Sequence, residues 1–219
     1  MGIKNALLVG NQERVISSCD FIDIAKNRAV ENFYPAQVDE NGQRKFILSN
    51  NIFPSSTTNI TANTTGTETE ILQNRTFETL IDVPITIEGD VILSVPIAID
   101  ADATEVGVCF LSGAIFISGA TLNTELGRVS GASMLNVASS NLENFSSIRM
   151  SIPKTDIKRN EYLQVQLQVC GYSVGGVNVR FSMGWDTSGR GQAGTATNWN
   201  FGSIDTSVTS QAKVLIPIK

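Results

Sequence analysis

The chain has 219 residues, a formal net charge of −5 and no histidine. A chain of this length forms one domain of ordinary size, or one domain with an arm. The absence of histidine excludes His-dependent catalytic triads and the common zinc sites, and the acidic balance argues against a nucleic-acid surface. We therefore expect no cofactor, no metal and no direct nucleic-acid partner, and no stretch of the sequence reaches membrane-spanning length.

Residues 1–54 are predicted to form an extended N-terminal arm. Residues 18–33 permit one short helix capped by Ser18, and residues 33–49 predict a hairpin because Asn41-Gly42 supplies the positive φ angles of a tight turn. The few apolar residues of this arm cannot form a core of their own, so we expect them to gain burial against a partner. The candidate contact residues are Phe21, Ile22, Ile24, Phe33, Tyr34, Phe46, Ile47 and Phe53.

Residues 55–76 are interpreted as an Asn/Thr-rich linker or exposed loop. Between Ser55 and Glu70 the only large aliphatic residue is Ile60, which is too little apolar surface to pack a core.

From residue 77 to residue 219 the sequence predicts an all-β fold. Runs of Ile, Val, Leu and Thr are broken every 8 to 12 residues or so by turn-forming residues, which is typical of an antiparallel, jelly-roll-like β-sandwich. Prolines inside the apolar runs are expected at sheet edges, bulges or strand starts. The predicted strands are 80–87, 90–99, 105–110, 114–118, 146–153, 162–170, 178–185 and 207–218.

The predicted strand 162–170 alternates Leu or Val with three glutamines, Gln164, Gln166 and Gln168. Such alternation predicts one buried face and one wetted face. Uncharged amides can bond to a neighbouring protein without the cost of burying charge, so the glutamines are candidate partner contacts. An ordinary solvent-facing surface is the alternative.

Several short motifs suggest chemistry. Asp100-x-Asp102-x-Thr104 resembles the nucleophile motif of haloacid-dehalogenase phosphatases, which implies attack by Asp100 and acid–base work by Asp102. That family is a parallel α/β fold, and no crossover helices are predicted here. With Glu105 the same acids form either a calcium loop or an acidic turn.

Two further predictions concern cysteines and aromatic residues. Cys19, Cys109 and Cys170 have no metal or disulfide spacing and are predicted to be buried free thiols. The glycine-rich stretch 185–201 contains Trp185, Trp199 and Phe201. Their rings either stack on sugars or a partner, or cap the core.

A histidine-free, Asn/Thr/Gly-rich β-sandwich with a poorly packed arm resembles virion structural proteins of tailed phages and related viruses, in particular capsid decoration and jelly-roll accessory proteins. The resemblance implies a non-enzymatic protein of the virion, assembled in the host cytoplasm. It also implies that the arm docks on capsid or other virion proteins while the sandwich forms a homo-oligomer, which we take to be a trimer. The alternative is a carbohydrate-binding jelly-roll module that uses the loop from Trp185 to Phe201.

Overall fold

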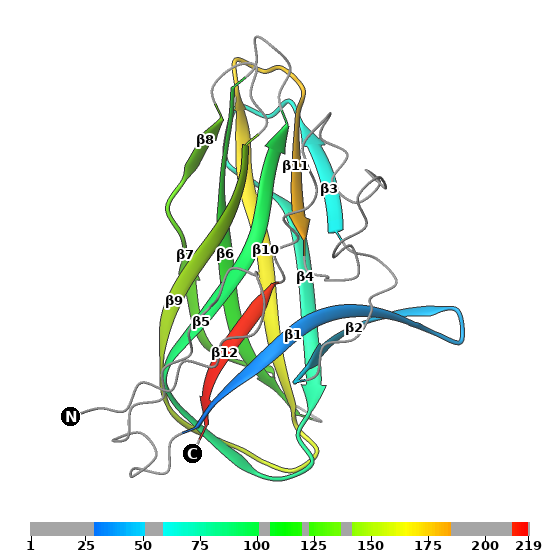
Figure 1. The fold of residues 1–219 in the computed structure, drawn as a ribbon, viewed down its shortest axis with the longest axis vertical. Coiled ribbons are helices and arrows are strands. Elements are labelled where there is room, and N and C mark those ends of the chain that lie inside the picture. Colours follow the sequence, from blue (N-terminus) through cyan, green and yellow to red (C-terminus); the bar gives the residue numbers. More distant parts are fainter. Residues whose placement is uncertain are drawn as a thin grey trace, which may run out of the picture.

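The computed structural model describes residues 29–50, 59–100, 106–119, 123–136, 142–184 and 212–218. In these segments the chain is all β and contains no helix, so none of them forms a helix that could cross a membrane. Figure 1 shows the strands arranged as an elongated sandwich. The strands are β1 (Ala29–Glu40), β2 (Gln43–Ser49), β3 (Asn59–Thr64), β4 (Glu70–Leu80), β5 (Ile85–Asp100), β6 (Val106–Ser118), β7 (Asn123–Ser130), β8 (Met134–Asn136), β9 (Leu142–Ile157), β10 (Tyr162–Val174), β11 (Val179–Gly184) and β12 (Lys213–Ile218).

The strands form two sheets that share one strand. Sheet I has β5 at its centre, with β9 on one edge and with β12 and β11 on the other; β3 continues from β11. Sheet II runs β2-β4-β10-β6-β7, and β8 also pairs with β6. Between the strands that the structure describes, all pairings are antiparallel except a single parallel contact between Ile47 and Glu78. The predicted all-β, antiparallel sandwich is therefore confirmed.

Strand β1 joins the two sheets. Ala29 to Phe33 pair with β12 of sheet I, and from Tyr34 onward the strand pairs with β2 of sheet II. Pro35 lies directly after this change of partner. Proline has no amide hydrogen to donate to a ladder, so its place beside the switch is consistent with the edge or break expected for a strand proline.

The core lies between the sheets and is built by alternating side chains. In β10 the four residues Leu163, Val165, Leu167 and Val169 are fully buried, which confirms the predicted alternation. Burying an aliphatic side chain of this size contributes about 1.5–3 kcal/mol relative to leaving it exposed. Facing them, β5 contributes a second inward row, made of Val91, Leu93, Val95, Ile97 and Ile99.

Two of the strand prolines lie where β5 changes its pairing. Pro96 falls between the residues of β5 that pair with β12 and those that pair with β11. Pro217 lies in the register shift between β12 and β5, and Gly89 of β5 provides the matching irregularity with φ of 122°. A Cβ at Gly89 would meet the Pro217 ring at 3.5 Å. The expectation for these two prolines is confirmed.

The predicted N-terminal elements need two corrections. Residues 29–33, placed in a short helix, are in β1, because pairing with β12 and burial of Phe33 outweigh local helix preference; the rest of that helix lies outside the described residues. The range 55–76, interpreted as a linker, contains β3 and the first part of β4. Pairing with β11 and β10 satisfies the backbone of these polar strands, which their composition does not reveal.

The strand boundaries also differ from those predicted. The predicted strand 80–87 is interrupted, because residues 81–84 form the connection between β4 and β5. The Ile81 amide donates to the Glu161 carbonyl at 2.9 Å, and the Asn160 amide donates to the Ile81 carbonyl at 2.8 Å. These bonds tie the connection to the turn between β9 and β10. The predicted strands 105–110 and 114–118 are one strand, β6.

The predicted hairpin is confirmed, with Asn41 and Gly42 at φ of 52° and 76°. Its base belongs to the core, since Phe33 is 6% exposed and Leu48 is 2% exposed. Its tip projects sideways beyond the sandwich (Figure 1). The segment expected to be a separate arm is therefore anchored at one end and extended at the other.

Candidate functional site on the outer face of sheet II

The three glutamines of β10 lie on the outer face of sheet II, opposite in direction to the buried leucine and valine residues. Register brings them beside polar or small residues of β4 and β6 and beside one aromatic residue, Phe116. We call this surface the amide face. Its rows across β4, β10 and β6 are Glu78–Gln164–Phe116, Thr76–Gln166–Ala114 and Asn74–Gln168–Ser112.

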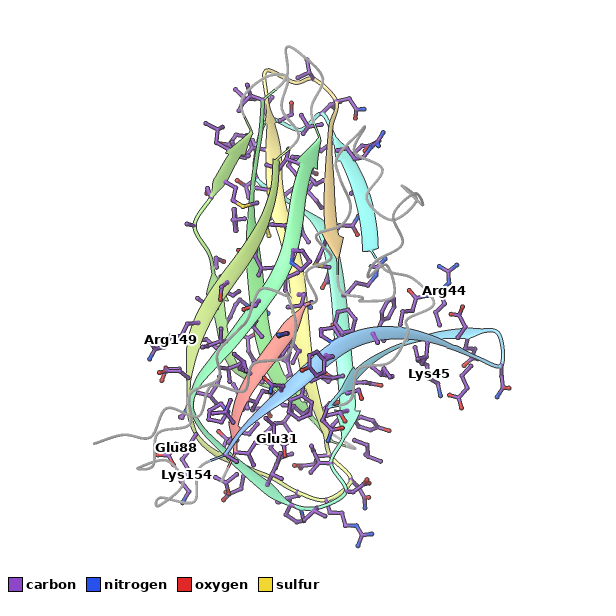
Figure 2. All side chains as sticks on the ribbon, in the orientation of Figure 1. Glu31, Arg44, Lys45, Glu88, Arg149 and Lys154 are labelled. Carbon is purple, nitrogen blue, oxygen red and sulfur yellow. The ribbon has the colours of Figure 1, made fainter. Side chains whose placement is uncertain are left out.

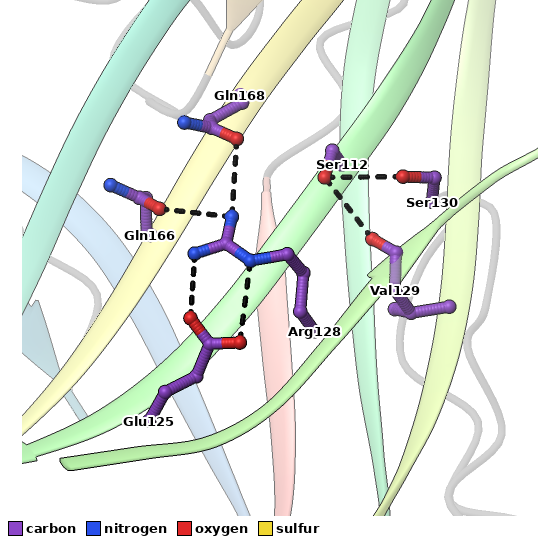
Figure 3. Close-up of polar contacts among 7 residues, drawn as sticks. All are labelled: Ser112, Glu125, Arg128, Val129, Ser130, Gln166 and Gln168. Atoms are coloured by element: carbon purple, nitrogen blue, oxygen red, sulfur yellow. Dashed lines mark hydrogen bonds and ion pairs between the residues drawn. The ribbon is translucent and has the colours of Figure 1, made fainter.

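Arg128 of β7 organises the amide face (Figure 3). Its Nη1 donates to the side-chain oxygens of Gln166 and Gln168, each at 3.3 Å. Its Nε and Nη2 donate to the two oxygens of Glu125, at 3.3 and 2.7 Å. The guanidinium carbon also lies 5.8 Å from the centre of the Phe116 ring. This contact set holds the guanidinium in one orientation, as bidentate arginine–carboxylate pairs do.

The side chains of Gln164 and Ser112 are also tied to neighbours. Gln164 donates from Nε2 to Glu78 at 3.0 Å. The Ser112 hydroxyl donates to the carbonyl of Val129 at 3.3 Å and accepts from the Ser130 hydroxyl at 3.3 Å (Figure 3). The side chains are thus positioned by the protein itself rather than left free to rotate.

The face nevertheless keeps unused hydrogen-bonding capacity. Arginine only donates, so the Gln166 and Gln168 atoms that face Arg128 are oxygens and both amide nitrogens point elsewhere. Neither nitrogen has a hydrogen-bond partner among the described residues. Gln168 is only 8% exposed, whereas the side chains of Arg128 and Glu125 are about two-fifths exposed. The surface therefore presents fixed amide donors beside exposed carboxylate acceptors.

The arm residues predicted as partner contacts fall into three groups. Phe33 is in the core, so its ring is covered by its own chain. Tyr34 and Ile47 are partly buried, and the Phe46 ring packs edge-on against Phe77 with centroids 5.6 Å apart. The residues that lie outside the described segments are Phe21, Ile22, Ile24 and Phe53.

A second arginine lies at the junction of hairpin and sandwich. The guanidinium carbon of Arg75 is 5.3 Å from the centre of the Phe46 ring, and its Nη1 donates to the Asn74 carbonyl at 2.6 Å. Partial burial, and then the nearby Arg44, lower the pKa of Arg75. At the tip, Lys45 pairs with Glu40, and this contact raises the pKa of Lys45 and lowers that of Glu40.

Most residues of the other sequence motifs lie outside the described segments. Trp185, Trp199 and Phe201 lie outside the described residues, as do Asp102 and Glu105. Asp100 ends β5, and its backbone pairs with Arg180. Among the described residues, no group of three His, Cys, Asp or Glu side chains is close enough together to hold a metal.

Two of the cysteines can be placed. Cys109 and Cys170 are buried free thiols, as predicted, and Cys19 lies outside the described residues. Cys109 pairs in register with Gly171, which follows the inward-facing Val169 on the same side of β10, so Cys109 faces the core of the sandwich. Cys170 follows Gln168 on the other side of β10, so it lies toward the outer face. Burial raises the pKa of the Cys109 thiol to about 12, with a smaller contribution from Cys170.

Sequence reasoning missed Arg128 and Glu125 because β7 was not predicted as a strand. Its sequence, Asn123–Ser130, is largely exposed and contains few apolar residues. In a regular strand two residues three apart point to opposite faces. Here Gly127 pairs with Ile115 and Glu125 pairs with the next residue, Phe116, so β7 contains one extra residue at this point. This bulge brings Glu125 and Arg128 onto one face. No pattern in the sequence marks this bulge.

The sequence matches no protein-family model and no curated protein. Solved structures with a similar fold include a CocE/NonD family hydrolase from Staphylococcus aureus, 12% identical with a TM-score of 0.44, covering 85% of this chain and 36% of that one. An aminopeptidase from a marine sediment archaeon, Thaumarchaeota archaeon, is 8% identical with a TM-score of 0.46, covering 88% and 37%. Infectious bursal disease virus, Gx strain, is 11% identical with a TM-score of 0.35, covering 98% and 40%.

These comparisons correct one prediction. The sequence predicted that the protein is not an enzyme, and the first two solved structures, a hydrolase and an aminopeptidase, contradict this. The chain spans less than half the length of each of the three structures, and the likeness is one of fold alone, so no reaction is assigned to it.

Proposed function

We propose that the protein is a structural subunit of a virion that assembles through its β1–β2 hairpin. The observation that carries the proposal is the hairpin itself, which is anchored in the core by Phe33 and Leu48 and projects beyond the sandwich (Figure 1). Figure 2 labels Arg44 and Lys45 on the β2 side of this projection, where their charges still reach Arg75 and Glu78 of the sandwich. The resemblance of the sequence to capsid decoration and accessory proteins supports the same role.

The tip has the features of a strand that accepts another strand. Val38 to Glu40 and Gln43 to Lys45 pair with each other, and no further described strand pairs with either outer edge of this stretch. Unpaired strand edges present backbone donors and acceptors that a neighbouring chain can complete. The partner in this proposal is a second copy of the chain, and the closed assembly is a trimer, to which other virion proteins bind.

The glutamines of the amide face are a weaker choice for this contact. The oxygens of Gln166 and Gln168 already bond to Arg128, and the strand that carries the glutamines, β10, is paired on both of its edges, so it has no open edge to offer. The loop that contains Trp185, Trp199 and Phe201 lies outside the described residues, so the carbohydrate-binding alternative at that loop stays a prediction.

Sedimentation velocity on the full-length protein tests the proposal. We expect a discrete oligomer at about 100 µM, a concentration that populates complexes of micromolar affinity. A variant in which Val38 to Lys45 are replaced by Asn-Gly keeps the base of the hairpin and should sediment as a monomer. Arg149→Ala, on the opposite side of the molecule (Figure 2), is the matched control and should assemble normally. A monomeric full-length chain, or normal assembly of the shortened hairpin, would contradict the proposal.

A further inference from the structure

We propose that the amide face of sheet II binds a neutral oligosaccharide. This inference goes beyond the proposed function and does not depend on it. It starts from the density of fixed, mixed donors and acceptors on one exposed surface: two amide nitrogens, one guanidinium and the carboxylates of Glu125 and Glu78. A sugar hydroxyl both donates and accepts, so a surface that offers both kinds of group in alternation matches its chemistry.

The carboxylate of Glu125 and the three glutamines keep hydrogen-bonding capacity for a ligand. Glu125 accepts two bonds from Arg128 and retains further acceptor capacity, since an ionised carboxylate accepts about four bonds. Gln166 and Gln168 use their oxygens on Arg128 and keep their amide hydrogens. Gln164 uses its nitrogen on Glu78 and keeps its oxygen as an acceptor. Donors and acceptors are thus sorted before any ligand arrives, which lowers the ordering cost of binding.

The dimensions suit a chain of sugars better than one sugar. Gln164, Gln166 and Gln168 repeat every second residue of a strand, so the row extends about 13 Å along β10 at roughly 3.3 Å per residue. Arg128 and Glu125 lie to one side of this row on β7, and Glu78 lies to the other on β4. The row is long enough to bind several sugars at once.

A neutral ligand fits the charge of the face. Arg128 already pairs with Glu125, and Lys45, whose charge reaches Glu78, already pairs with Glu40, so the three carboxylates outnumber the two cations. A sulfated or sialylated chain would face net negative charge. Within these rows the one large apolar side chain is Phe116, and the Arg128 guanidinium lies over its ring. The other large apolar side chains lie beyond the rows, with Leu80 opposite Tyr162 at one end and Ile71 opposite Cys170 at the other, so the centre of the face has no free apolar anchor for a protein partner.

Saturation-transfer NMR and calorimetry on the full-length protein test the inference with four neutral probes, the hexasaccharides of glucose, xylose, mannose and N-acetylglucosamine. At about 5 mM probe, we expect at least one hexasaccharide to bind the protein with a Kd of about 1 mM or tighter. Arg128→Ala and Gln166→Met should each weaken binding about tenfold, because each removes fixed donors. Melting curves establish that both variants stay folded.

Arg149→Ala is the matched control, since Arg149 pairs with Asp90 on the outside of the other sheet, and it should bind like the unaltered protein. The inference is overturned if no hexasaccharide binds. It is also overturned if a probe binds Arg128→Ala and Gln166→Met with unchanged affinity, or if Arg149→Ala loses binding equally. If no probe binds and Arg128→Ala instead dissociates an oligomer, the face is a protein interface.

Discussion

Gly113 of β6 lies directly across the sandwich from Leu93 of β5. A Cβ at position 113 would be 2.1 Å from Cδ1 of Leu93, which is closer than side-chain atoms approach, and 3.1 Å from Cδ1 of Ile148, which is an unusually tight contact. The two sheets therefore meet at a point where one of them carries no side chain.

Gly113→Ala should destabilise the protein by about 1–3 kcal/mol, the usual cost of overpacking a core. Gly119→Ala is the control, because its Cβ would meet only the Glu161 side chain at 3.6 Å, an ordinary contact. Urea unfolding measures both. In a Leu93→Ala background the Gly113→Ala penalty should shrink, since the two positions share one space. An equal penalty in both backgrounds would show that the clash is not with Leu93.

Gly42→Ala should lower stability by about 1 kcal/mol through backbone strain alone. Its φ is 76°, where a side chain is disfavoured, yet a Cβ there would meet nothing within 4 Å. Asn41→Gly, at the neighbouring position with φ of 52°, should be neutral or slightly stabilising. Thermal melting of the two variants distinguishes strain from packing. An unchanged melting temperature in Gly42→Ala would contradict the left-handed turn.

The Cys109 thiol should make stability fall at high pH. Its folded pKa is raised from 9.0 to about 12 by burial, so the neutral thiol is favoured in the folded state. Below pH 9 both states keep the proton and stability is fully present. Between about pH 9 and 12 only the unfolded state ionises, and this thiol contributes a loss of up to about 1.4 kcal/mol per pH unit.

Unfolding of the unaltered protein and of Cys109→Ala at several pH values measures this contribution. Other groups titrate in the same range, so the decisive quantity is the difference between the two proteins. That difference should shrink as the pH rises above 9. A difference that is constant from pH 8 to pH 11 would contradict a buried thiol at this position.

Removing the hairpin should unfold the sandwich. An arm separate from the sandwich, as the sequence predicted for residues 1–54, could be removed without loss of the fold. Deletion of residues 1–50, however, removes Phe33 and Leu48 from the core and leaves β12 without β1. Each lost core side chain costs several kcal/mol. A chain lacking only residues 1–28 retains all of β1 and is the matched comparison. Circular dichroism and melting of the two proteins give the answer; a folded 51–219 fragment would show that β1 is dispensable.

The sequence predicted most of the fold where strands are half-buried. The alternation in β10 and the Asn41-Gly42 turn are local signals, so both were found. β3, β4 and β7 were missed because polar strands gain their stability from backbone pairing with β11, β10 and β6, which composition does not encode. The glutamines of the candidate site were predicted to face outward. Their partner Arg128 could not be predicted, since a bulge places it.

By itself, the sequence determined the fold class and the face of each apolar strand, because a period of two in side-chain polarity depends only on strand geometry. It also determined where prolines interrupt pairing. Only the tertiary structure decided that β1 belongs to both sheets, that Gly113 meets Leu93, and that Glu125, Arg128 and two glutamines form one bonded cluster. These relationships join residues far apart in the chain, and they depend on register and sheet spacing, which no local pattern specifies.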